Sequence, residues 1–113
     1  MAYRVLLGPY EILDLPDGGS VDIHPVSFEM GTMTISPRYP GAPASKEIIA
    51  LRIHVREGTK SYPPMYYDVT SQTLIAQLMP GLEEQGFENY VYRVTKYGVA
   101  PKARFTLARI PRA

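Results

Sequence analysis

The chain of 113 residues contains no cysteine and only two histidines. Without cysteine there can be no disulfide framework, no thiolate nucleophile and no cysteine-ligated zinc or iron–sulfur centre. The sequence also lacks an HExxH pattern, a glycine-rich phosphate loop and a G-x-S-x-G elbow. We therefore expect a protein that is not an enzyme and that holds no metal and no cofactor.

Long apolar runs are missing as well, since no stretch approaches the roughly 20 apolar residues of a membrane-spanning helix. The first residues, Met-Ala-Tyr-Arg, do not resemble the apolar core of a secretion signal. The composition, 45% hydrophobic and 20% charged, is typical of a folded globular domain. We expect one cytoplasmic domain spanning residues 1–113, with no membrane partner. Eleven prolines are compatible with a thermophilic source.

Acidic residues are absent from the last part of the chain. Residues 1–89 contain six Lys and Arg against all eleven Asp and Glu, a net charge of −5, whereas the last 24 residues contain six Lys and Arg and carry +6. Such asymmetry indicates an anionic partner for the basic end. Pairing between the basic end and the acidic part of the same fold would produce the same pattern.

The first half of the chain predicts strands separated by turns. Pro-Asp-Gly-Gly-Ser at 16–20 has the residues of a tight turn. Pro25 and Gly31 interrupt the segment around them, which therefore predicts two short strands or one strongly bent strand. The clearest alternation of apolar and polar residues lies at 48–56, and it predicts a strand with one core face and one basic face. The predicted strands are residues 3–15, as one long strand with a bulge or as two short strands (3–7 and 10–15), 21–35 and 48–56.

The second half predicts a helix followed by a hairpin. Thr70 or Ser71 is suited to cap a helix that runs to about Gln85, with apolar residues at helical spacing and Gly86 as its stop. Pro80 should kink or split this helix. Residues 90–97 and 103–110 are rich enough in β-branched and aromatic residues to be strands.

The resulting order is three strands, a helix and two closing strands. It resembles the element order of the OB-fold, a small Greek-key barrel that binds oligonucleotides and oligosaccharides. We expect an α+β fold, either a small, mostly antiparallel β-barrel or a curved sheet, with one helix between the third and fourth strands. A mixed sheet with one packed helix fits the same order.

The C-terminal hairpin interleaves aromatic and basic residues. Aromatic rings stack on unpaired bases, and Lys or Arg neutralise phosphate, so the pattern indicates binding of single-stranded nucleic acid. Alternation puts these residues on two mixed faces, so some of the tyrosines are expected to be core. The candidate residues are Tyr90, Tyr92, Arg93, Lys96, Tyr97, Lys102 and Arg104.

A second basic row, Arg52, His54 and Arg56, alternates along the strand predicted at 48–56. In a small barrel this row would extend the nucleic-acid surface of the hairpin. The alternative is a solvated face whose arginines pair with Glu11, Asp14 or Asp22.

The segment Tyr-Pro-Pro-Met-Tyr-Tyr at 62–67 is an aromatic loop on a rigid proline backbone. Exposed aromatics of this kind are typical of partner contacts, here through Tyr62, Met65 and Tyr66. The same loop could instead plug one end of the core. We therefore keep a second hypothesis: a protein-interaction or assembly module, such as a viral or accessory subunit, that forms a homo-oligomer or binds another protein.

The two histidines, His24 and His54, are the only candidates for acid–base catalysis. A hydrolase or nuclease would require them to lie within a few ångströms of each other. His24 precedes Pro25, which restricts it to extended conformations, and strand geometry explains this placement without any catalytic role.

Overall fold

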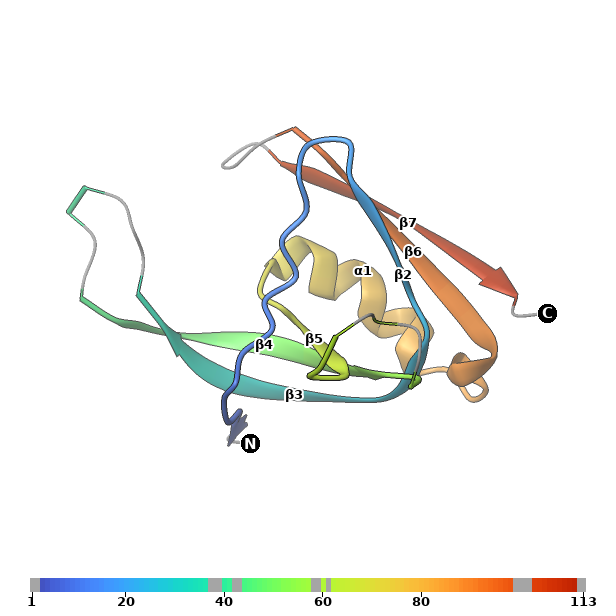
Figure 1. Ribbon diagram of the computed structural model, residues 1–113, viewed down its shortest axis with the longest axis horizontal. Coiled ribbons are helices and arrows are strands. Elements are labelled where there is room, and N and C mark those ends of the chain that lie inside the picture. The colour runs from blue at the N-terminus through green and yellow to red at the C-terminus, as the bar shows by residue number, and fades with distance from the viewer. Residues whose placement is uncertain are drawn as a thin grey trace.

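In the computed structural model, the described residues form seven β-strands in two sheets and one α-helix (Figure 1). The structure describes residues 3–36, 40–41, 44–57, 60, 62–98 and 103–111. In this part of the chain the two sheets stay separate and do not close into a barrel. The expected α+β class is confirmed, whereas the predicted barrel and its OB-like order are not.

The first sheet has four strands in the order β1-β3-β4-β5. β3 and β4 form a long antiparallel hairpin in which Gly31 faces Ala50, and the short β1 runs parallel to β3. The far end of this hairpin extends away from the helix and from the second sheet (Figure 1). The strands are β1 (Arg4–Val5), β3 (Pro25–Ile35), β4 (Lys46–Val55) and β5 (Tyr66–Val69).

The second sheet has three antiparallel strands in the order β2-β6-β7. β6 and β7 form the predicted C-terminal hairpin, and β7 is an edge strand with no further strand beside it in the described residues. The strands are β2 (Ser20–Ile23), β6 (Tyr90–Tyr97) and β7 (Arg104–Pro111).

The chain passes from one sheet to the other at His24. Pro25 has no amide hydrogen to donate to a ladder, and the register of β3 against β4 shifts between Pro25 and Ser27. The carbonyl of His24 accepts the amide of Arg56 at 3.0 Å, so the bend is tied to the end of β4. The two sheets diverge from this bend, and the helix lies between them (Figure 1).

The helix α1 (Gln72–Leu82) begins where the sequence predicts it. The Ser71 hydroxyl is the N-cap and accepts the amide of Leu74 at 3.4 Å. Its buried apolar face packs into the gap between the sheets. A 3₁₀ turn, η1 (Phe87–Asn89), leads into β6.

The main core is built from both sheets and the helix. Alternate residues of β4 and β6 point inward toward α1, as the two-residue period of a strand requires. The buried members are Ile23, Leu51, Ile53, Val55, Val69, Leu74, Ile75, Leu78, Leu82, Tyr92 and Val94. A second, smaller buried cluster contains Leu6, Met33 and Ala50.

Several predicted boundaries are wrong near the N-terminus. Instead of two strands at 3–7 and 10–15, the chain forms only β1 and a single bridge between Ile12 and Asp68. Gly31 does not interrupt β3, because the missing side chain makes room for the chain that crosses at this point. The predicted turn at 16–20 is confirmed, with Gly18 at a positive φ of 80°.

Two further differences lie around the helix. β5 was not predicted, since its first residues belong to the segment 62–67 that was interpreted as a loop. Pro80 does not split the helix, because it lies in the last turn, where its missing amide removes only one bond. The helix ends at Leu82, three residues before the predicted end at Gln85.

Candidate interaction surface

The N-terminal strap, residues 3–13, includes β1 beside β3 and reaches β5 at the opposite edge of the four-stranded sheet. At one end the amide of Leu6 donates to the carbonyl of Thr32 on β3 at 2.8 Å. At the other end the amide of Asp68 on β5 donates to the carbonyl of Glu11 at 2.7 Å. Since β3 and β5 lie on either side of β4, the strap crosses one face of this sheet (Figure 1).

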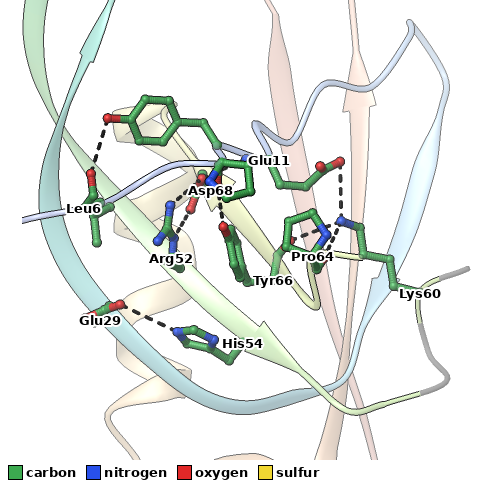
Figure 2. A network of polar contacts seen from close by, with 11 residues as sticks. Leu6, Glu11, Glu29, Arg52, His54, Lys60, Pro64, Tyr66 and Asp68 are labelled. Atoms are coloured by element: carbon green, nitrogen blue, oxygen red, sulfur yellow. Dashed lines mark hydrogen bonds and ion pairs between the residues drawn. The ribbon is translucent and has the colours of Figure 1, made fainter. Parts of the chain in front are cut away.

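A buried ion pair fastens the strap to the sheet. The Nε of Arg52 lies 2.7 Å from Oδ1 of Asp68 and its Nη2 lies 3.1 Å from Oδ2, and both side chains are buried. The same Oδ2 accepts the amide of Glu11 at 2.9 Å, and Arg52 also stacks over the ring of Tyr66 at 4.1 Å (Figure 2). The hydrogen bond to Asp68 raises the pKa of Arg52. Two charge-assisted bonds therefore hold β4, β5 and the strap together.

The three residues of the predicted basic row on β4 therefore have different environments. Arg52 is buried under the strap, whereas His54 is half-buried and Arg56 is exposed. His54 Nε2 lies 3.6 Å from Oε1 of Glu29, and its ring meets that of Tyr66 edge to face (Figure 2). The row does not present three adjacent free cations to solvent.

Lys60 organises the loop before β5. Its side chain is buried, and its ammonium donates to the carbonyls of Pro64 at 2.7 Å and Tyr66 at 3.3 Å. The carboxylate of Glu11 lies 3.4 Å away (Figure 2), and the ammonium also lies over the ring of Tyr62. The carboxylate of Glu11 on the strap and the ring of Tyr62 in the loop therefore both contact the ammonium of Lys60.

The predicted partner-binding residues of this loop have three different environments. Tyr62 is exposed, and its hydroxyl donates to Glu11 at 3.2 Å, while the charge of Glu11 raises the pKa of Tyr62. Met65 packs against the main core. Tyr66 begins β5, and its hydroxyl donates to the carbonyl of Pro9. The loop closes over the strap, and only Tyr62 offers a largely exposed ring.

On the inner face of the C-terminal hairpin, the aromatic residues are mostly structural. Tyr92 is 1% exposed and belongs to the main core. Tyr90 is half-buried beneath the guanidinium of Arg109, which lies 4.4 Å from its ring centre and pairs with Glu84. Lys96 is half-buried on this same face, opposite Phe105.

On the outer face, Arg93 is paired with Asp22 of β2 through bonds of 2.8 and 3.1 Å. The hydrogen bond from Arg93 lowers the pKa of Asp22. Tyr97, 52% exposed, and Arg104 are cross-strand neighbours at the free end of the face. Lys102 lies outside the described residues. The structure therefore brings only part of the predicted nucleic-acid site together at the surface.

Exposed apolar side chains gather on the strap. Nine large hydrophobic residues are exposed in the described part of the chain, and five of them belong to the strap. The extreme cases are Leu7, 75% exposed, and Val5, 60% exposed, which lie on either side of the buried Leu6. The five are Tyr3, Val5, Leu7, Tyr10 and Ile12. Concentrated apolar exposure of this kind marks a contact surface.

A pocket of about 900 Å³ opens where the strap passes the start of α1. Its walls come from the strap, the junction of β5 and α1, and the inner face of the C-terminal hairpin. The lining residues are Ile12, Leu13, Asp14, Val69, Thr70, Ser71, Thr73, Leu74, Lys96, Ala103 and Phe105.

Both histidines make contacts within the fold. No group of three or more potential metal ligands occurs among the described residues. His54 is engaged with Glu29 and Tyr66, and His24 contributes its carbonyl to the bend between the sheets. Over the same residues, no helix has the length and apolar character to cross a membrane.

Sequence reasoning missed the strap and the pocket beside it. The signal was the odd-numbered apolar series Tyr3, Val5 and Leu7, whose outward face is as apolar as its inward one. The apolar side chains on both faces of such a segment favour burial, and one sheet can bury only one of the two faces.

The comparisons with known proteins give no family or relative from which a function could be inferred. No protein-family model matches the chain, and no curated protein and no solved structure matches it either.

Proposed function

We propose that this protein is an assembly module whose N-terminal strap binds a second copy of the chain. The observation that carries the proposal is the exposure of five large apolar side chains on one short segment that is itself pinned to a rigid sheet. Burying such side chains against a partner contributes roughly 1.5–3 kcal/mol each. Because the strap is already ordered, little conformational entropy is lost on binding.

Charge complementarity favours a second copy over an unrelated protein. The ion pairs Asp22–Arg93 and Glu84–Arg109 each join the acidic part of the chain to its basic end. Each pair neutralises one charge on either side, so, counting only the ion pairs between described residues, −5 for residues 1–89 becomes −3 and +6 for the last 24 residues becomes +4. The remaining asymmetry suits a head-to-tail contact, in which the basic end of one copy lies against the acidic body of the next.

The test is sedimentation velocity of the purified protein over a range of concentrations. The wild-type chain should associate reversibly, and the double variant Val5→Ser/Leu7→Ser should weaken association by more than about tenfold. Both side chains are largely exposed, so the variant should melt at the wild-type temperature.

Val26→Ser is the matched control, because Val26 is an exposed apolar residue on β3, outside the strap. It should associate as the wild type does. A wild-type chain that stays monomeric at every accessible concentration, or equal weakening by both variants, would contradict the proposal.

A second candidate function, binding of single-stranded nucleic acid, is supported by one observation. Tyr97 and Arg104 are exposed cross-strand neighbours on the outer face of the three-stranded sheet, where a ring can stack on a base and a guanidinium can reach phosphate. Arg52 and Tyr92 are buried, so any such site is smaller than the one predicted from sequence.

Fluorescence anisotropy with a labelled single-stranded oligonucleotide at several salt concentrations tests this candidate. Tyr97→Ala should reduce affinity with little change in the salt slope, whereas Arg104→Ala should flatten the slope by about 0.7. Unchanged binding in both variants, or no binding at low salt, would exclude this surface.

A further inference from the structure

The pocket beside the start of α1 shares Ile12 with the exposed apolar side chains of the strap, but none of the other four lines it. Val69 and Leu74 at its floor belong to the main core, and the partly buried Leu13 and Phe105 pack against that core. A volume of about 900 Å³ lies within the range of sites that enclose small ligands. The walls are held in place, because α1, β5 and β6 are all parts of the same core.

Among the described residues that line this pocket, Lys96 is the one basic side chain. Its backbone is fixed on both sides: Gly18 donates to its carbonyl at 2.8 Å, and its amide donates to Gly19 at 3.0 Å. The residue is half-buried on the inner face of β6, opposite Phe105. Within the described chain, no hydrogen bond or ion pair engages its ammonium.

The remaining polar groups of the pocket leave this cation uncompensated. The first turn of α1 contains no acidic residue, and it contributes the hydroxyls of Ser71 and Thr73, which lie 3.0 Å apart. In the described part of the lining Asp14 is the only carboxylate; it is exposed, and no ion pair joins it to Lys96. A half-buried lysine beside apolar walls favours an anion that brings an apolar body with it.

We propose that this pocket binds an apolar carboxylate, with the carboxylate on Lys96 and the apolar part against Leu74 and Phe105. The site does not depend on self-association, so it goes beyond the proposed assembly function. A carboxylate of this type is carried by a free aliphatic acid and by an acidic side chain next to an apolar one in a peptide. Both present the same chemistry to Lys96.

The experiment is a titration of ¹⁵N-labelled protein followed by amide chemical shifts. The probes are octanoate, octyltrimethylammonium as the cation with the same chain, and acetate as the head group alone. Octanoate should shift the amides of residues 69–74 and 96 in a saturable way, whereas the other two should not saturate over the same range. The peptide N-acetyl-Phe-Asp-amide forms a separate arm: saturation by octanoate alone assigns a free acid, and saturation by the peptide assigns a peptide carboxylate.

Two variants test the roles of the residues. Lys96→Met keeps the length of the side chain, removes its charge and should weaken octanoate binding roughly tenfold. Thr73→Asp places a carboxylate in the pocket and should also weaken binding, although an acid in the first helical turn stabilises the helix itself. Loss of binding in this variant therefore cannot be attributed to unfolding.

The matched controls are Lys46→Met at the exposed start of β4 and Ala76→Asp on an exposed position of the same helix. Both lie outside the pocket lining and should bind octanoate as the wild type does. Binding of the cation as tight as that of octanoate, or unchanged affinity in Lys96→Met, would overturn the proposal. Because self-association is measured separately by sedimentation velocity and with other variants, failure here leaves the self-association of the strap untouched.

Discussion

Asp68 joins β4, β5 and the strap. It is fully buried, pairs with Arg52 through two bonds and accepts the amide of Glu11. Removing one member of a buried pair leaves the other charge without compensation, which typically costs 3–5 kcal/mol.

We therefore expect Asp68→Ala to lower the free energy of unfolding by about 3–5 kcal/mol in urea denaturation. The strap should also become sensitive to limited proteolysis, because its anchor is gone. Asp22→Ala, which breaks the exposed pair with Arg93, is the control and should have a much smaller effect. Equal effects in the two variants would show that the Arg52–Asp68 pair is not an anchor.

Tyr92 illustrates the opposite situation, a buried polar atom without compensation. Its hydroxyl has no hydrogen-bond partner among the described residues, and burial raises the pKa of the phenol. Tyr92→Phe should therefore leave stability within about 0.5 kcal/mol of the wild type or increase it. Tyr92→Ala should cost about 3–5 kcal/mol, because the ring fills the core. A large loss in the phenylalanine variant, measured by thermal unfolding, would reveal a partner for the hydroxyl.

The pair Asp22–Arg93 predicts a pH dependence with a definite sign. Arg93 lowers the folded-state pKa of Asp22, so the stabilisation is fully present above the unfolded pKa of about 4. It is lost as the pH falls through the lower folded value. A carboxyl-carbon NMR titration should place the midpoint of Asp22 below that of an unfolded aspartate. In Arg93→Gln the midpoint should rise, and a midpoint that does not move would show that another group causes the shift.

At the scale of elements, the crossing of the strap over β3 depends on one glycine. A Cβ built at Gly31 would lie 2.6 Å from the carbonyl oxygen of Arg4 and 2.6 Å from the side chain of Leu6. The strap backbone passes here, so the contact cannot be relieved by rotating a side chain alone.

Gly31→Ala should consequently displace the strap and destabilise the fold by about 1–3 kcal/mol, measured by urea unfolding. Thr34→Ala, at an exposed position of the same strand, should change stability by less than about 0.5 kcal/mol. A neutral Gly31→Ala variant with unchanged strap amide shifts would mean that the strap does not cross as closely as described.

Local sequence patterns predicted the strands and the helix whose formation depends on residues close together in the chain. The alternation along 48–56 and 90–97 and the cap at Ser71 were sufficient to place β4, β6 and α1. The strap was not predictable in the same way, because its hydrogen bonds join residues 57 positions apart. β5 was obscured by the prolines before it, and it is only four residues long, all of them paired with β4.

The candidate site was predicted less completely than the elements. Arg52 alternates with apolar residues as an exposed cation would, and only the register of β4 against β5, which places Arg52 beside Asp68, reveals that it is buried. The pairing of Arg93 could not be predicted either, because its partner on β2 lies 71 residues away in the chain.

At the scale of the whole molecule, the residual charge asymmetry predicts how assembly responds to salt. The acidic body and the basic end retain about −3 and +4 after their internal pairs are formed. Raising the NaCl concentration from about 0.05 to 0.5 M shortens the screening length and should weaken head-to-tail association in sedimentation velocity. Association that strengthens steadily with salt would mean that apolar contact alone drives it, and the head-to-tail arrangement would then lose its support.

The order of synthesis also determines when the strap can form its contacts. Glu11 is made well before Asp68, the residue 57 positions later to which it bonds. At elongation rates of about 5–20 residues per second, that interval lasts roughly 3–11 seconds. Throughout it, Ile12 and Leu13 lack the strand β5 with which they pair, so the nascent chain presents this apolar part of the strap to any chaperone near the ribosome.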